Sequence, residues 1–215
     1  MKTSSRRERT PKTTRDVLLK AAFAEVYRTG FQAASLEKIL ATAGVTKGAL
    51  YHHFPGKTEL GYAIIEEVLT GWVRTHWLQP MSKHQNPIDG IVAALNTGWG
   101  SGSSDEIKLG CPLNNLAQEM SPLDEGFRKR IDSVLTVWRG GIAASLARGQ
   151  REGTVRDDIH PHRIASFIVA SIEGIIGTAK NAQSHDVAKS NFEILAKFVE
   201  TLRARARYST ARSLR

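Results

Sequence analysis

The feature that most constrains the fold is residues 35–57, SLEKILATAGVTKGALYHHFPGK, where two short helical patterns are joined by a tight turn. Ser35 is suited to cap the first helix, and Gly44 then lets the chain turn with positive φ at no steric cost. Thr46 is suited to cap the second helix, which ends before Pro55. The first helix would bury Leu36, Ile39, Leu40 and Ala43 on one side. This spacing predicts a helix-turn-helix.

The second helix, Lys47 to His53, would have one apolar and one polar face. At 100° per residue, Leu50 and Phe54 would anchor the helix against the body of the domain. The outward face would carry Lys47, Gly48, Tyr51 and His52. Because Gly48 has no side chain, this face could approach base edges or phosphates closely. Lys57 opens the next helix, where backbone N–H groups and an ammonium together suit a phosphate. The layout favours insertion of the second helix into the DNA major groove.

At this point the chain resembles a known family. The segment GVTKGALYHHFPGKTEL is similar to the DNA-binding signature of the TetR-type transcriptional regulators, and TTRDVLLKAAFAEVYRTGF is similar to their first helix. Leu40 departs from the alanine often found at its position. The resemblance implies an all-α fold, with an N-terminal three-helix helix-turn-helix DNA-binding domain and a C-terminal helical ligand-binding and dimerisation domain. The residues expected to contact DNA are Ser35, Thr46, Lys47, Gly48, Tyr51, His52 and Lys57.

Each of these residues also has a purely structural interpretation. A Gly-Val-Thr turn occurs in many helical proteins that bind no DNA, Lys47 alone can be a solvated lysine, and Tyr51 alone can be a half-buried aromatic. His52 and His53 suggest a metal, but neighbours in sequence lie about 100° apart on a helix and cannot readily chelate one ion. We therefore expect no metal and no cofactor, and the joint pattern favours DNA binding.

Positive charge is concentrated where a DNA-binding protein needs it. The formal net charge is +9, and residues 1–60 carry 11 basic and 5 acidic side chains. Such a surface releases counterions when it binds phosphates. Residues 203–215 add five arginines and no acid, which we interpret as a solvated terminus. The N-terminal MKTSSRRERTPKTTR lacks the apolar segment of a secretory signal and is expected to be a flexible arm.

The single cysteine excludes an intrachain disulfide, and no apolar run approaches the length of a membrane span. These features favour a cytoplasmic protein that does not enter a membrane. We expect a flexible basic arm at 1–12, the helix-turn-helix domain at 13–56, a helical regulatory and dimerisation domain at 57–206 and a basic tail at 207–215.

The rest of the chain shows helical periodicity, with no alternating strand pattern and no repeat. Helices are expected at about 13–29, from Lys57 toward Trp77, at about 88–98, after Pro112, from Ser121 to Gly149 or Gly153, at 161–182 and at 187–206. A linker, QPMSKHQNP, is expected between Pro80 and Pro87, and a flexible loop over GWGSGSSDEIKLG. The resemblance implies that the last two helices form a four-helix homodimer interface, which matches a palindromic double-stranded DNA operator.

The segment GCPLNNLAQEMS, residues 110–121, resembles the branch of TetR-type repressors that respond to reactive electrophiles or unsaturated small molecules. Cys111 would lie at a helix start, where backbone N–H groups favour the thiolate, although a lone cysteine is more often buried and inert. Asn115, Trp99 and Trp138 are further candidates for effector binding, and each is equally compatible with an ordinary surface or core position.

Three functions remain open at this point. The leading hypothesis is a homodimeric repressor that a small-molecule or electrophilic effector releases from DNA. A DNA-bound structural protein without an effector is the second. The third is an enzyme with Cys111 as nucleophile, which would need a histidine partner and an oxyanion-binding set. The sequence places no histidine beside Cys111 and contains no nucleophile-elbow or phosphate-loop motif. We therefore expect no enzymatic activity.

Overall fold

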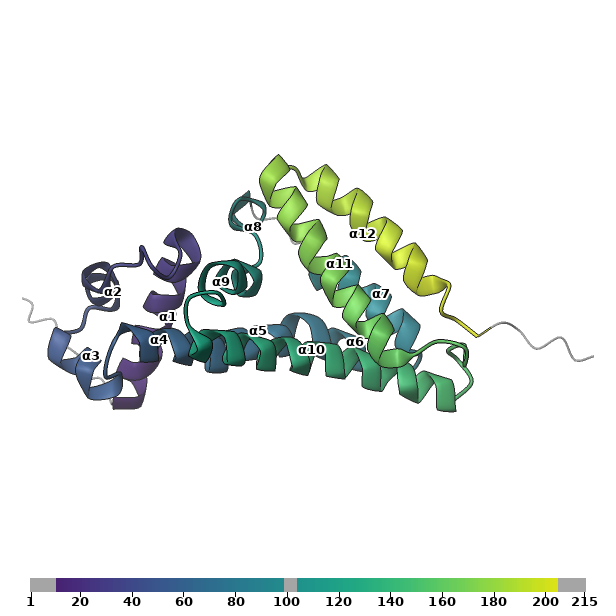
Figure 1. Ribbon diagram of the computed structural model, residues 1–215, viewed down its shortest axis with the longest axis horizontal. Helices are drawn as coiled ribbons and strands as arrows, with labels where there is room; N and C mark the ends of the chain where they lie inside the picture. Colours follow the sequence, from purple (N-terminus) through teal and green to yellow (C-terminus); the bar gives the residue numbers. More distant parts are fainter. Residues whose placement is uncertain (1–10, 99–103, 205–215) are drawn as a thin grey trace, which may run out of the picture. The chain divides into compact units, whose positions relative to one another are not determined.

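The computed structural model describes residues 11–98 and 104–204, and these residues form helices without a β-sheet (Figure 1). The helices up to Gly98 are α1 (Pro11–Thr29), α2 (Leu36–Ala43), α3 (Lys47–His53), α4 (Lys57–Ala63), α5 (Thr70–Val73), α6 (Gln79–Ser82) and α7 (Pro87–Gly98). Two π-helical stretches, η1 (Ile64–Leu69) and η2 (Arg74–Leu78), join α4, α5 and α6 into one continuous helical segment. The helices after Ser104 are α8 (Ser104–Leu109), α9 (Pro112–Met120), α10 (Glu125–Arg151), α11 (Pro161–Ala182) and α12 (His185–Glu200).

The described residues form two compact units. The first contains the chain up to Val73 together with Ser104–Val137, and the second contains Arg74–Gly98 together with Trp138–Ala204. The second and third helices thus belong to the same unit as α9, although α9 comes much later in the sequence.

The core of the first unit forms around α1, which packs against α2, α3 and α4 (Figure 1). Leu18, Ala22 and Val26 of α1 are buried, as their four-residue spacing predicts. An aromatic cluster closes this core: the Phe127 ring centroid lies 4.6 Å from that of Phe31 and 5.0 Å from that of Tyr62. The cluster depends on a glycine at position 61, because a Cβ there would lie 2.5 Å from Phe31 and 2.6 Å from Phe127.

The second unit packs α12 against both α11 and α7 (Figure 1). Trp77 of η2 and Trp138 of α10 are fully buried, with ring centroids 4.9 Å apart. The end of the described chain is tied down by Ala204, whose N–H donates to the Thr154 carbonyl at 3.0 Å. Among residues 11–98 and 104–204, the helices lack the length and apolar character that a membrane span requires.

Most predicted helices are confirmed, but one linker, one loop and two helix ends differ from the prediction. Pro80 does not begin a linker, because it lies within α6 and the helix continues to Ser82. The predicted flexible loop contains helix α8. Helix α10 begins at Glu125 because the Asp124 carboxylate accepts the N–H of Phe127 at 2.9 Å and caps the helix there. The last helix ends at Glu200, six residues earlier than expected. The predicted arm and tail lie largely outside the described residues.

Candidate DNA-binding site

Side-chain caps set the ends of the two short helices. The Ser35 hydroxyl oxygen accepts the N–H of Lys38 at 3.4 Å, and the Thr46 hydroxyl oxygen accepts the N–H of Ala49 at 3.2 Å. Between the helices, Gly44 has φ of 61°, in the left-handed region that glycine adopts without strain. The predicted helix-turn-helix is therefore present, and each end has the physical cause expected from the sequence.

Helix α3 has the two faces that its sequence predicts. Leu50 is fully buried and Phe54 is 2% exposed, so these side chains anchor the helix. Lys47, Gly48, Tyr51 and His52 are exposed on the other face. The Tyr51 side chain is 46% exposed, and the Lys47 ammonium lies 5.9 Å from its ring centroid, within the range of a cation–π contact. This face can offer a cation, a phenol and an imidazole to a ligand.

A groove of about 530 Å³ lies beside this face. It is lined by Ala34, Ser35, Leu36, Glu37, Leu40, Lys47, Leu50, Tyr51 and Lys57. Four of these residues, Ser35, Lys47, Tyr51 and Lys57, are predicted DNA contacts. They come from the start of α2, from α3 and from the start of α4, and the structure brings them to one surface. Leu36 and Leu40 are half-buried on the wall of the groove, which corrects their predicted place in the core. The groove has apolar walls, a lysine on each of α3 and α4, and the acidic Glu37 on α2.

Lys57 is held in place by residues 31–32, a segment that the sequence pattern did not predict as part of the site. Its ammonium donates a hydrogen bond to the Gln32 carbonyl at 2.9 Å and lies 5.2 Å from the Phe31 ring centroid. A lysine ammonium has three N–H donors, so this bond leaves two for a phosphate. Phe31 and Gln32 follow Gly30, whose φ is in the left-handed region. This glycine is the sequence signal that indicates a turn near the site.

Arg15 of α1 supports the back of the helix-turn-helix. Both of its terminal nitrogens donate to the Glu67 carboxylate at 2.5 Å, and its guanidinium carbon lies 5.0 Å from the Phe54 ring centroid. The hydrogen bonds from Arg15 hold the pKa of Glu67 below its ordinary value. Arg15 therefore links α1 to η1 and to the apolar anchor of α3.

The residues predicted to bind an effector do not all fall in one unit. Cys111 and Asn115 lie together at the start of α9 in the first unit, where the Asn115 N–H donates to the Cys111 carbonyl at 3.0 Å. The Asn115 side chain donates to the Leu109 carbonyl at 2.8 Å, and Cys111 is 2% exposed. Trp138 belongs to the second unit, and Trp99 lies outside the described residues.

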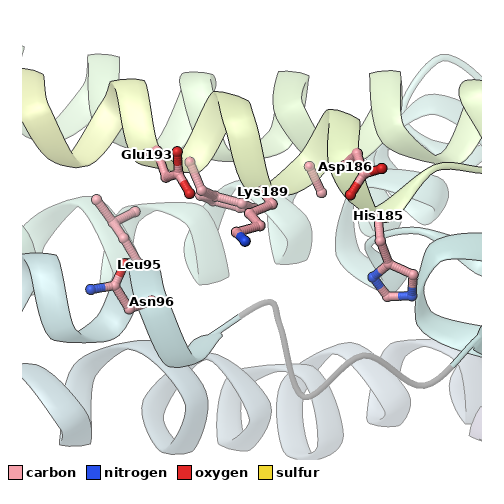
Figure 2. Close-up of a pocket in the computed structure, with 8 residues that line it drawn as sticks. Leu95, Asn96, His185, Asp186, Lys189 and Glu193 are labelled. Atoms are coloured by element: carbon pink, nitrogen blue, oxygen red, sulfur yellow. The ribbon is translucent and has the colours of Figure 1, made fainter.

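A separate pocket of about 330 Å³ lies in the second unit, between α7 and α12 (Figure 2). Figure 2 shows His185, Asp186, Lys189 and Glu193 of α12 across from Leu95 and Asn96 of α7. Its charged side chains are of both signs, Leu95, Ala188 and Phe192 make part of its lining apolar, and it contains none of the predicted effector residues. Within the described ranges, no three His, Cys, Asp or Glu side chains gather in a way that could hold a metal ion.

Two parts of the chain match known protein families. Residues 18–64 match the family described as bacterial regulatory proteins, tetR family, and residues 90–195 match the tetracyclin repressor-like C-terminal domain. The HTH-type transcriptional regulator in the lacX 3′ region of Lactococcus lactis is 28% identical over 182 residues, which cover 85% of this chain and 91% of that protein. The HTH-type transcriptional repressor DhaR of Mycobacterium sp. (strain GP1) is 27% identical over 154 residues, covering 68% and 72%.

The fold is shared with solved structures. A TetR transcriptional regulator from Chloroflexus aurantiacus superposes with a TM-score of 0.80 at 24% identity, covering 91% of this chain and 98% of that one. The helix-turn-helix, the helical C-terminal part and these similarities agree, and the chain belongs to the TetR family of helix-turn-helix transcriptional regulators.

Proposed function

We propose that this regulator is a homodimeric repressor that binds a palindromic operator and is released by a small-molecule or electrophilic effector. The observation that carries the proposal is the exposed face of α3, where Lys47, Gly48 and Tyr51 stand beside a groove that also includes Lys57. A short capped helix with this exposed face is the element that helix-turn-helix proteins place in the major groove.

In the proposed complex, Lys47, Tyr51 and His52 contact base edges, and Gly48 lets the helix come close. A Cβ at Gly48 would have Thr46 Oγ1 as its nearest neighbour, at 3.9 Å, so the surface around it is open. Ser35 and Thr46 use their hydroxyl oxygens as caps and keep an O–H to donate to phosphates. Lys57 binds a phosphate at the start of α4. Phosphate contacts set the position of the helix, and base contacts select the sequence.

The outer face of α11 and α12 supports the proposed dimer. Phe167 is 53% exposed and Ile194 is 63% exposed, which is unusual for large apolar side chains on neighbouring helices. They border a hollow of about 390 Å³ that also includes Phe198. A Cβ on Gly174 would meet nothing within 4 Å, so a second pair of helices can approach closely there. Two-fold pairing would set the recognition helices about 34–36 Å apart, one turn of DNA.

Release by an effector is supported by the position of Cys111. Cys111 is the N-cap residue just before α9, and the N–H groups of a helix start favour a thiolate. Because Cys111 is buried, an electrophile would reach it only when α9 moves away from its neighbours, so the reaction itself would report a changed conformation. Trp138 and Asn115 are the further proposed effector contacts. Family members are transcriptional regulators, DhaR is named a repressor, and we assign this chain the same sign of regulation, acting in the cytoplasm.

The proposal is tested by selecting binding sites from random DNA with the purified protein. A palindromic consensus, bound by two protein chains in sedimentation velocity, is the expected result. Tyr51→Ala should weaken binding to that consensus more than binding to random DNA. Leu123→Ala removes an exposed apolar side chain in the same unit but outside the site, and it should bind like the wild type. A selection that yields no consensus would overturn the proposal.

A further inference from the structure

Glu119 reaches from helix α9 to the helix-turn-helix. Its two carboxylate oxygens accept the backbone N–H groups of Phe31 and Gln32, each at 2.8 Å. A carboxylate that accepts two backbone N–H groups forms charge-assisted hydrogen bonds, which are stronger than neutral ones. Glu119 therefore fixes the turn between α1 and α2 through that turn's own backbone.

The turn is shaped to receive this carboxylate. Gly30 has φ of 85°, and a Cβ there would lie 3.1 and 3.2 Å from the two Glu119 oxygens. A side chain at position 30 would thus be strained by its backbone and would also crowd the carboxylate. Gly30 and Glu119 are 89 positions apart in sequence, yet in the fold the missing side chain of Gly30 leaves room for the Glu119 carboxylate.

The two residues that Glu119 holds are also the two that hold Lys57. The Lys57 ammonium donates to the Gln32 carbonyl at 2.9 Å and rests 5.2 Å from the centre of the Phe31 ring. The carboxylate, the backbone of residues 31–32 and the ammonium therefore form one continuous series of contacts within the first unit. A long lysine side chain loses much rotamer freedom when it binds a phosphate, and this support removes part of that freedom beforehand.

Helix α9 is itself anchored at its other end. The Tyr27 hydroxyl of α1 donates to the Gly110 carbonyl at 2.5 Å, just before α9 begins. Leu113, Leu116 and Met120 of α9 are buried. Glu119 thus projects from a helix that is fixed to the first unit at both ends, which restricts the motion of its carboxylate.

We propose that Glu119 is a positioning residue for DNA binding, which places the Lys57 ammonium for its phosphate by holding the backbone of Phe31 and Gln32. This inference rests on the proposed function, because it takes Lys57 to be a phosphate contact. In this role an acidic side chain strengthens DNA binding. The direction in which DNA affinity changes when the carboxylate is removed therefore tests the role. Simple electrostatics predicts that removing a carboxylate tightens DNA binding, whereas a positioning role predicts that it weakens binding.

The test measures binding of the full-length protein to a fluorescent mixed-sequence DNA duplex by anisotropy, over a series of KCl concentrations. This probe needs no known operator, because non-specific binding reports phosphate contacts. Glu119→Gln should bind about five- to tenfold more weakly at low salt, the size expected for the net contribution of one hydrogen bond. The slope of log K against log salt should become less negative by about 0.9, as for the loss of one phosphate contact.

Three further variants make the result specific to Lys57. Lys57→Ala should show the same loss and the same change of slope, and the double variant should be no weaker than Lys57→Ala alone. Glu125→Gln is the matched control, because Glu125 lies in the same unit and pairs with Arg128 on its own helix. It should bind as tightly as the wild type or more tightly. If circular dichroism shows that Glu119→Gln is unfolded, Glu119→Asp is measured in its place, because it keeps the charge but shortens the side chain.

The outcomes separate this inference from the proposed function. A wild type that does not bind the duplex at low salt would overturn both. If the wild type binds and Lys57→Ala weakens it while Glu119→Gln does not, the proposed function stands and the positioning role is wrong. Losses that multiply in the double variant would also overturn the inference, because they would show that the two residues act independently. Faster amide exchange in a peptide spanning 27–36 of Glu119→Gln, with α3 unchanged, is the expected accompanying result.

Discussion

Replacing Thr46 with alanine should show how far the recognition helix depends on its cap. Thr46 Oγ1 accepts the Ala49 N–H at 3.2 Å, and α3 has only seven residues. Losing an N-cap hydroxyl typically costs about 1 kcal/mol. A helix this short is not stable alone in water, so its first turn, which carries Lys47 and Gly48, should loosen. For a chain of this size, we expect the melting temperature to fall by about 2–4 °C.

DNA binding should weaken as well, because the duplex must then re-form the first turn of α3. A cost of about 1 kcal/mol corresponds to roughly fivefold lower affinity, measured by anisotropy with a labelled duplex. Thr46→Ser keeps the hydroxyl and should restore both values. Ser184→Ala is the matched control, because Ser184 caps α12 in the second unit through an equivalent bond to the Val187 N–H at 3.3 Å. It should lower the melting temperature by a similar amount and leave DNA affinity unchanged.

Two results would contradict this role of the Thr46 cap. Thr46→Ala could keep wild-type affinity, which would show that the cap does not order the DNA-binding face. Alternatively, Thr46→Ser could bind as weakly as Thr46→Ala, and the methyl group rather than the hydroxyl would then be the important part of the side chain.

Three other expectations test separate parts of the account. Ile194→Lys should convert the proposed dimer to a monomer in sedimentation velocity, because a lysine would have to be buried in each copy; an unchanged dimer would place the interface elsewhere. Cys111→Ser should keep DNA affinity and abolish release by N-ethylmaleimide, whereas normal release would move the sensor to another group. Because Arg15 lowers the pKa of Glu67 below 4.5, wild type should melt above Glu67→Gln at pH 7 and lose that advantage as pH falls through the lowered pKa; a pH-independent difference would contradict the ion pair's role.

The local parts of this structure were predictable because their causes are local. Gly44, Thr46 and the apolar pair Leu50 and Phe54 act within a few residues of the turn, so their spacing alone predicts the helix-turn-helix. The start of α10 was misplaced for a related reason. Ser121-Pro122 and Asp124 are both adequate start signals, and only the structure shows that the Asp124 carboxylate accepts the N–H of Phe127.

The contacts that the sequence could not predict join distant parts of the chain. Glu119 occupies an ordinary position near the end of an amphipathic helix, and no local pattern relates it to Phe31 and Gln32. The same limit applies to the proposed effector residues, because Cys111 and Trp138 are only 27 positions apart and yet belong to different units. Periodicity indicates which side of a helix is buried, but it does not indicate which neighbour buries it.

The most direct test of the account is DNase footprinting of the purified protein on the DNA upstream of its own gene. The reduced protein and the protein treated with N-ethylmaleimide would be compared on the same fragment. We expect a palindromic protected region that is lost on treatment and retained by treated Cys111→Ser. Protection that survives treatment would keep the DNA-binding role and contradict release through the thiol. A protected region without two-fold symmetry would contradict the central claim that a dimer reads a palindromic operator.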